Sequence, residues 1–441
     1  MTQPYPVAAL DSPVTQRRIL TLAWPVMLSN ITVPLLGLVD TAILGHLSDA
    51  RHLGAVAIGA QLFTLLLWSF GFLRMGTTAL TARASGRQAD VLQVLQQALW
   101  LSAPVLLMVL SAAIILVPVL LPLMGATAAT EQAAATYLQI RLLAAPAVLA
   151  QYALTGWFIG LGQTRMPLLV LTVANLVNAL LDYLLVFGLG MTSDGVALGS
   201  VLADYSGTGL ALWLAHRQGL RGPGRWPGLE RLRPMLRINR QLFVRTLCLL
   251  AVLVFFTAQG ARAGELVLAA NAVFISLLLL ISNALDGFAH AAETLTGQAL
   301  GRGSAADVQR TLRLTGVNML LMALAMSGLL LLAGADIWPL LTDNPQLLPV
   351  LEQYQWFLIL LPLAGFPSFW LDGVLIGAQA TDAMRNAMIA AALLVFLPLW
   401  YSLQMLGNEG LWLAFFGFLL ARAAFVSGRF LTLFTRPQNF M

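Results

Sequence analysis

The sequence has no lysine and few charged residues of any kind, and both scarcities exclude classes of protein. All 24 basic residues among the 441 are arginine, and charged residues make up 10% of the chain against 59% hydrophobic residues. So few polar groups cannot cover the water-facing surface of a soluble protein. Without lysine, the chain cannot contain a Gly-x-x-x-x-Gly-Lys-Ser/Thr loop, so we exclude an ATP-driven P-loop within it.

Cysteine and histidine are also scarce. Cys248 is the single cysteine and lies inside an apolar stretch, which excludes an intramolecular disulfide and disfavours a cysteine-based metal site. The four histidines are scattered along the chain and do not form a metal-ligating pattern. Neither His-Glu-x-x-His nor Gly-x-Ser-x-Gly occurs, so an intramembrane enzyme is disfavoured. We expect neither an enzyme nor a bound metal or cofactor.

Long uncharged stretches predict an all-α polytopic membrane protein with twelve spans. A helix needs about 20 apolar residues to cross the hydrocarbon core. Stretches of 40 residues such as 91–130 do not alternate in polarity, so they cannot be strands of a membrane barrel. The predicted spans are 19–39, 53–73, 91–130, 142–164, 166–191, 195–215, 245–260, 266–285, 314–335, 353–371, 386–408 and 411–428.

The arginines predict the orientation of these spans in a bacterial inner membrane. Seven arginines lie in the loop 216–240 between the sixth and seventh spans, and with twelve spans this loop shares one side with both termini. The loops of the opposite side contain only Arg51 and Arg262. Because arginine-rich loops stay in the cytoplasm, we predict that both termini are cytoplasmic. The same rule explains the net charge of +5 without nucleic-acid binding.

The two sides of this loop form an internal repeat. Residues 156–164 (GWFIGLGQT) resemble 373–381 (GVLIGAQAT) at a shift of 217, and 79–87 (ALTARASGR) resemble 294–302 (TLTGQALGR) at a shift of 215. Six spans in each half make the repeat parallel, with a pseudo-twofold axis along the membrane normal, as in secondary transporters. We predict an N-lobe at 1–215, a cytoplasmic linker at 216–240 and a C-lobe at 241–441.

Two acidic residues inside predicted spans are the best candidates for a functional site. A charge at the membrane centre costs at least about 2.5–3.5 kcal/mol. Asp40 and Asp182 align through the repeat with Phe255 and Leu399, so the fold does not by itself require an acid at either place. Both lie in the outer half of the membrane by their position along their helices, and they could share a cavity.

Other polar residues accompany these acids. Asn175, Asn178 and Asp182 are spaced i, i+3 and i+7, which places them on one helical face. Asp204 forms a second polar face with Ser200 and Thr208. Asp286, Glu293 and Asp372 of the second half are expected to cap helices or anchor loops. Four arginines, Arg74, Arg141, Arg245 and Arg422, lie near predicted helix ends, where their side chains can extend to water.

The first span contains Pro25 and Pro34, each of which removes a backbone hydrogen bond. Prolines are common in membrane helices and can serve packing alone. Because they precede Asp40 on the same helix, we predict that this helix bends.

Several motifs resemble the multidrug and toxic compound extrusion (MATE) family, DinF branch. They are 29–46 (SNITVPLLGLVDTAILGH), 72–75 (FLRM), 284–288 (ALDGF) and 371–377 (LDGVLIG). The resemblance covers essentially the whole chain. It implies a drug and cation antiporter with two six-helix lobes, in which Asp40 is the main proton acceptor, Asp182 with Asn178 and Tyr137 is the accompanying polar network, and Pro25 is the bending point.

In another branch of the family that this chain resembles, a proposed sodium site includes an acid in the seventh helix. Residues 239–260 of this chain contain none, which favours protons over sodium. We predict an efflux antiporter, acting as a monomer in the membrane lipid, that exports lipophilic and mostly cationic compounds in exchange for protons. Sodium-coupled efflux, or a lipid-linked or polysaccharide flippase of the wider superfamily, remains the alternative.

Overall fold

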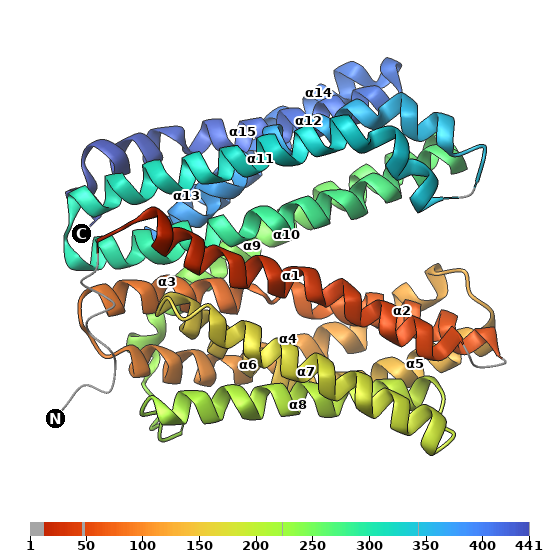
Figure 1. Cartoon of the computed structure of the whole chain (residues 1–441), viewed down its shortest axis with the longest axis horizontal. Helices are drawn as coiled ribbons and strands as arrows, with labels where there is room; N and C mark the ends of the chain where they lie inside the picture. The colour runs from red at the N-terminus through yellow and green to blue at the C-terminus, as the bar shows by residue number, and fades with distance from the viewer. Residues whose placement is uncertain (1–12, 46–48, 223, 343, 441) are drawn as a thin grey trace. The chain divides into compact units, whose positions relative to one another are not determined.

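The computed structural model describes residues 13–45, 49–222, 224–342 and 344–440. Nearly all of these residues are helical, and none of them lies in a strand (Figure 1). The first half contains α1 (Gln16–Gly45), α2 (Ala50–Trp68), α3 (Phe72–Gly86), α4 (Val91–Leu123), α5 (Ala128–Leu142), α6 (Ala145–Gly160), α7 (Arg165–Tyr183), the π-helical turn η2 (Leu184–Gly188) and α8 (Ser193–Arg217).

The second half contains α9 (Leu229–Arg262), α10 (Glu265–Arg302), α11 (Ala305–Leu341), α12 (Leu348–Gly377), α13 (Thr381–Ala390), the π-helical η3 (Ala391–Phe396), α14 (Leu397–Leu403), η4 (Gln404–Leu406), α15 (Asn408–Thr435) and η5 (Pro437–Phe440). In this half, α10 and α12 are each continuous where the first half has the pairs α2 with α3 and α5 with α6.

Membrane-spanning segments can be counted among the described residues. Nine helical segments are long and apolar enough to cross a membrane, and α5 with α6, bent by 51° relative to each other, would form a tenth. The remaining long helices α1 and α8 complete the twelve that the sequence predicts. α8 contains the charged residues Asp194, Asp204 and Arg217.

Polar side chains set the beginnings of several helices. Asp90 accepts hydrogen bonds from the backbone N–H groups of Leu92 and Gln93 at the start of α4. Ser304 accepts one from Asp307 at the start of α11. Both residues satisfy donors that a helix leaves unpaired in its first turn. The preceding helix α10 ends at Gly303, whose φ of 70° is a left-handed conformation that glycine adopts readily.

The chain folds as two compact units. Unit 1 contains residues 28–239, and unit 2 contains residues 13–27 together with 240–440. The boundary therefore passes through α1, whose first part belongs to unit 2.

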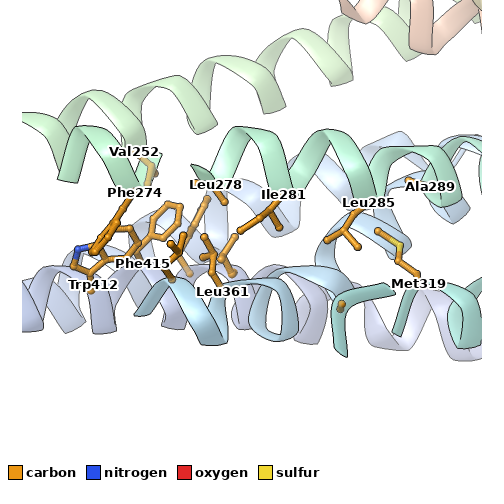
Figure 2. Packing of buried hydrophobic residues seen from close by; sticks show 14 of the residues in the cluster. Val252, Phe274, Leu278, Ile281, Leu285, Ala289, Met319, Leu361, Trp412 and Phe415 are labelled. Carbon is orange, nitrogen blue, oxygen red and sulfur yellow. The ribbon is translucent and has the colours of Figure 1, made fainter. Parts of the chain in front are cut away.

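Unit 2 has an extensive apolar core rich in aromatic side chains (Figure 2). Phe274 of α10 and Phe415 of α15 both pack edge-on against Trp412, with ring centroids 5.8 and 6.0 Å away. Such edge-to-face pairs add to the apolar burial. Val14 and the α1 residues Ile19, Leu22 and Ala23 are buried in the same core. The first part of α1 is thus an integral element of unit 2.

The predicted repeat appears as one packing motif present in both units. On α6, an added Cβ at Gly156 would lie 2.3 Å from the carbonyl oxygen of Arg74, and one at Gly160 would lie 2.8 Å from that of Thr78. On α12, an added Cβ at Gly373 or at Gly377 would lie 2.3 Å from the carbonyl oxygen of Ala289 or of Glu293, respectively. Glycines four residues apart let two helix backbones come close.

The positions on the facing helices also repeat. Arg74 and Thr78 of α3 are shifted by 215 to Ala289 and Glu293 of α10, which is the shift between 79–87 and 294–302 in the sequence. The glycines are shifted by 217, as are 156–164 and 373–381. The sequence repeat therefore reflects a shared contact between helix backbones.

Candidate functional site

A row of polar residues on α8 joins three other helices of unit 1. The amide of Asn178 on α7 donates a hydrogen bond of 3.2 Å to the hydroxyl of Ser200. One turn further along α8, Asp204 forms an ion pair of 2.7 Å with Arg141 of α5. Thr208 then donates to the backbone carbonyl of Ala147 on α6, at 3.0 Å. The predicted polar face of α8 is thus directed into the unit.

Asp182 is completely buried, with none of its surface exposed, on the face of α7 that packs against α8. An added Cβ at Gly199 would lie 2.1 Å from Asp182 Oδ1, so the carboxylate occupies the space that this glycine leaves open. Asn178 is 1% exposed, whereas Asn175 is half-buried. The structure thus brings Asp182 and Asn178 together with the Ser200 region of α8. The π-helical turn η2 begins two residues after Asp182, and such turns are frequent at functional sites.

The equivalent place in unit 2 is apolar. An added Cβ at Gly417 of α15 would lie 2.5 Å from Leu399 Cδ1. Asp182 and Leu399 are related by the shift of 217, and Gly199 and Gly417 by 218. A leucine therefore fills the same helix-to-helix space that the buried carboxylate fills in unit 1, and this agrees with the alignment predicted from the sequence. Packing alone does not call for an acid at position 182.

Tyr137 is 2% exposed and lies in a small apolar cluster with Leu44, Val56, Val186, Val196 and Ala197. Its ring covers Gly59 of α2, where an added Cβ would lie 2.4 Å from the ring. Val186 lies one turn beyond Asp182, and Ala197 lies close to Ser200 in the sequence. The cluster therefore lies beside the polar residues of α7 and α8.

The candidates on α1 are only partly described. Asp40 and Pro34 lie within α1, but their side chains are outside the described residues. The shared cavity of Asp40 and Asp182 therefore stays a prediction. Pro25 is buried, and it lies in the part of α1 that belongs to unit 2.

The expectation that arginines near helix ends extend to water is wrong for three of them. Arg141 is paired with Asp204, its side chain is 13% exposed, and its guanidinium carbon lies 4.1 Å from the centre of the Phe63 ring. Arg245 and Arg422 are 8% and 4% exposed. A buried guanidinium needs a counter-charge, and each of these three has found one on another helix.

The same contacts correct the role expected of Asp372. Its Oδ2 accepts hydrogen bonds from Nη2 of Arg422, at 2.6 Å, and from Nη2 of Arg245. Asp372 of α12 therefore joins α9 and α15 instead of capping a helix. Glu293 is also buried, at 1% exposed, and lies 3.0 Å from Nδ1 of His290 on the same helix. The sequence offered one signal for these pairs, which is that acids and arginines occur together in stretches that are otherwise apolar.

No group of three or more His, Cys, Asp or Glu side chains that could hold a metal ion occurs in the described part of the chain. Three of the carboxylates instead have partners of two kinds, which are arginines at Asp204 and Asp372 and a histidine at Glu293. Asp182 lies against Gly199, near the hydrogen bond between Asn178 and Ser200.

A profile of the MatE family matches the chain twice, at residues 25–184 and again at 242–401. The chain belongs to this family. The two matches are separated by 217 residues, which is one of the two shifts found within the sequence. Membership makes the protein a multi-pass membrane transporter of the multidrug and toxic compound extrusion family, and not an enzyme.

Relatives and solved structures agree with this membership. The chain is 38% identical to the DNA damage-inducible protein F of Escherichia coli over 414 residues, which cover 91% of this chain and 89% of that protein. It is 24% identical to the multidrug resistance protein PmpM of Pseudomonas aeruginosa, over 90% of this chain and 87% of that one.

The solved structures share the fold at lower identity. A crystal structure of MATE in the bent conformation matches with a TM-score of 0.82 at 20% identity, covering 98% of this chain and 97% of that one. A mutant of the Vibrio cholerae MATE transporter VcmN matches with a TM-score of 0.85 at 18% identity, covering 99% of both chains. The predicted all-α membrane fold is confirmed.

Proposed function

We propose that this MatE-family transporter is a proton-coupled efflux antiporter for lipophilic, mostly cationic compounds. The buried carboxylate of Asp182 is the observation that carries the proposal, because the equivalent space in unit 2 holds Leu399. Removing a carboxylate from water disfavours its charged form, so a proton arriving from outside can bind there. A neutral acid no longer attracts a cationic substrate, which couples proton uptake to substrate release.

In this mechanism Asp40 is the main proton acceptor and Asp182 the second. Asn178 and Ser200, which are joined by a hydrogen bond, hold the polar surroundings of Asp182 between α7 and α8, with Tyr137, Asn175 and Asp204 nearby. Protonation changes the hydrogen bonds of α1 near Asp40, and α1 bends at Pro25 or Pro34. The bend makes the cavity of the N-lobe smaller and expels the substrate. Two lobes and cytoplasmic termini are part of the same proposal.

The names of the relatives support export of drugs. PmpM and the NorM proteins of several bacteria are named as multidrug resistance proteins. We favour proton coupling over sodium coupling because residues 239–260, which include the seventh predicted span, contain no acid.

The test is efflux from proteoliposomes under separate proton and sodium gradients, with a lipophilic cation, a neutral compound and an anionic compound as substrates. We expect the proton gradient to drive export of the cation, and Asp40→Asn to lower the rate at least tenfold. The matched control is Asp49→Asn, which removes an acid that is exposed and paired with Arg51. Full proton-driven efflux by Asp40→Asn would refute the assignment, and export driven by sodium alone would favour the alternative.

A further inference from the structure

The two units have buried ion clusters of different charge balance. In unit 1, one arginine is paired with one acid, Arg141 with Asp204, so this pair is neutral. In unit 2, Arg245 and Arg422 share the single carboxylate of Asp372. The cluster of Arg245, Asp372 and Arg422 therefore carries one positive charge in excess, because arginine stays protonated in proteins.

This difference occurs at equivalent positions of the repeat. The shift of 218 that relates Gly199 to Gly417 also relates Asp204 of α8 to Arg422 of α15. The last helix of the first half, α8, thus contributes an acid to the ion pair of unit 1. The last helix of the second half, α15, contributes an arginine to the cluster of unit 2. Because the two halves share the same helix packing, the replacement of an acid by an arginine is not required by the fold.

One donor of this cluster has no acceptor. The Nε–H of Arg245 is buried and makes no hydrogen bond within the described part of the chain, although the side chain of Arg245 is only 10% exposed. The acid Glu293 is already bound to His290 and forms no ion pair with either arginine. A buried donor that lacks an acceptor destabilises the folded state, and more so on a charged group than on a neutral one.

The cluster is not fully enclosed by unit 2. The side chain of Asp372 is 19% exposed, and Asp372 lies five residues before the end of α12 at Gly377, or about 7.5 Å along the helix axis. The carboxylate shared by the two guanidinium groups is therefore partly accessible at the surface of unit 2.

We propose that the cluster of Arg245, Asp372 and Arg422 is a binding site for a small monovalent anion, either a halide or a carboxylate. The anion neutralises the excess charge and accepts the free hydrogen bond of Arg245 Nε. Guanidinium groups suit such ligands because their N–H donors form charge-assisted hydrogen bonds with anions, and their planar geometry also matches the two oxygens of a carboxylate. The site is separate from the proton-coupling residues proposed for unit 1 and does not depend on that proposal.

The experiment is a titration of the purified full-length protein with chloride and, in parallel, with formate. Ionic strength is held constant with the salt of a bulky sulfonate, and the unfolding temperature and tryptophan fluorescence are recorded. We expect a saturable response in the wild-type protein to at least one of the two anions. A response to formate alone identifies a carboxylate site, and a response to both identifies a general anion site. The absence of any saturable response would overturn the proposal.

Variants separate a binding site from a merely structural cluster. Arg245→Gln should weaken anion binding at least tenfold, whereas Arg51→Gln, which breaks an exposed ion pair, should leave it unchanged. Asp372→Ala removes the internal carboxylate that competes for the arginines, so it should bind the anion at least tenfold more tightly and regain stability as the anion is added. If Asp372→Ala gains nothing from either anion, or Arg245→Gln and Arg422→Gln titrate like the wild type, the cluster is not an anion site.

Discussion

At the scale of single residues, the sequence predicts which face of a helix is polar, but it does not predict which residue on another helix a buried charge contacts. Asp182 and three arginines illustrate the two cases. The spacing of Asn175, Asn178 and Asp182 was sufficient to predict a polar face on one helix, and the structure directs Asn178 and Asp182 of that face to α8. The ion pair of Arg141 with Asp204 could not be predicted, because the two residues are 63 positions apart and lie on different helices.

The space beside Asp182 offers a test that leaves every polar group in place. Gly199→Ala puts a methyl group 2.1 Å from Asp182 Oδ1 and must displace the carboxylate, whereas an added Cβ at Gly209 of the same helix meets nothing within 4 Å. Both changes improve helix propensity by about 1 kcal/mol. We expect Gly199→Ala to lower proton-driven efflux in proteoliposomes at least tenfold and Gly209→Ala to match the wild type. Equal rates in the two variants would show that the position of Asp182 does not matter for coupling.

At the scale of elements, α1 is the helix that is divided between the two units. Its apolar stretch and its prolines could be read from the sequence, but its division between two units could not. Gln16 and Arg18 contact Asn318 and Gln298 of unit 2, and Ala23 and Met27 pack against Gly287 of α10. The first part of α1 is thus attached to unit 2, while Asp40 lies on the part that belongs to unit 1. A bend near Pro25 would therefore occur where the helix leaves unit 2.

The contact at Gly287 predicts how this attachment can be loosened. An added Cβ at Gly287 would lie 2.7 Å from the backbone carbonyl oxygen of Ala23 and 2.3 Å from Met27 Cγ, while one at Gly328 of α11 meets nothing within 4 Å. Gly287→Ala should increase hydrogen exchange of residues 13–27 at least tenfold and slow transport, because α1 can no longer dock closely. Gly328→Ala should leave both unchanged. Unchanged exchange in Gly287→Ala would mean that α10 does not hold α1.

The bent pair α5 and α6 shows a second limit at this scale. The sequence predicts a span at 142–164, because Glu131 and Arg141 interrupt the apolar pattern before it. The structure instead extends the helical path back to Ala128, with a break near Leu143 and a bend of 51°. Arg141 is accommodated there because Asp204 neutralises its charge. A partner distant in the sequence thus decides whether a charge ends a span.

At the scale of the whole molecule, the arginine distribution predicts the orientation of the chain in the membrane. In a Cys248→Ala background, a cysteine at position 225, in the exposed loop between α8 and α9, should react with a membrane-impermeant maleimide only after the cells are permeabilised. A cysteine at position 129, exposed at the start of α5, should react in intact spheroplasts. The opposite pattern of labelling would invert the proposed orientation.

The sequence alone determined the number of spans, the repeat and the family, because each depends on the order of apolar and small residues along the chain. The glycines at 156, 160, 373 and 377 could be recognised as a repeat before the backbones that they contact were known. Only the tertiary structure decided which charges are neutralised and which are in excess. A desolvated charge is stabilised by an opposite charge that lies beside it. For Arg141, Arg245 and Arg422 that charge is a carboxylate on another helix, at least 50 residues away.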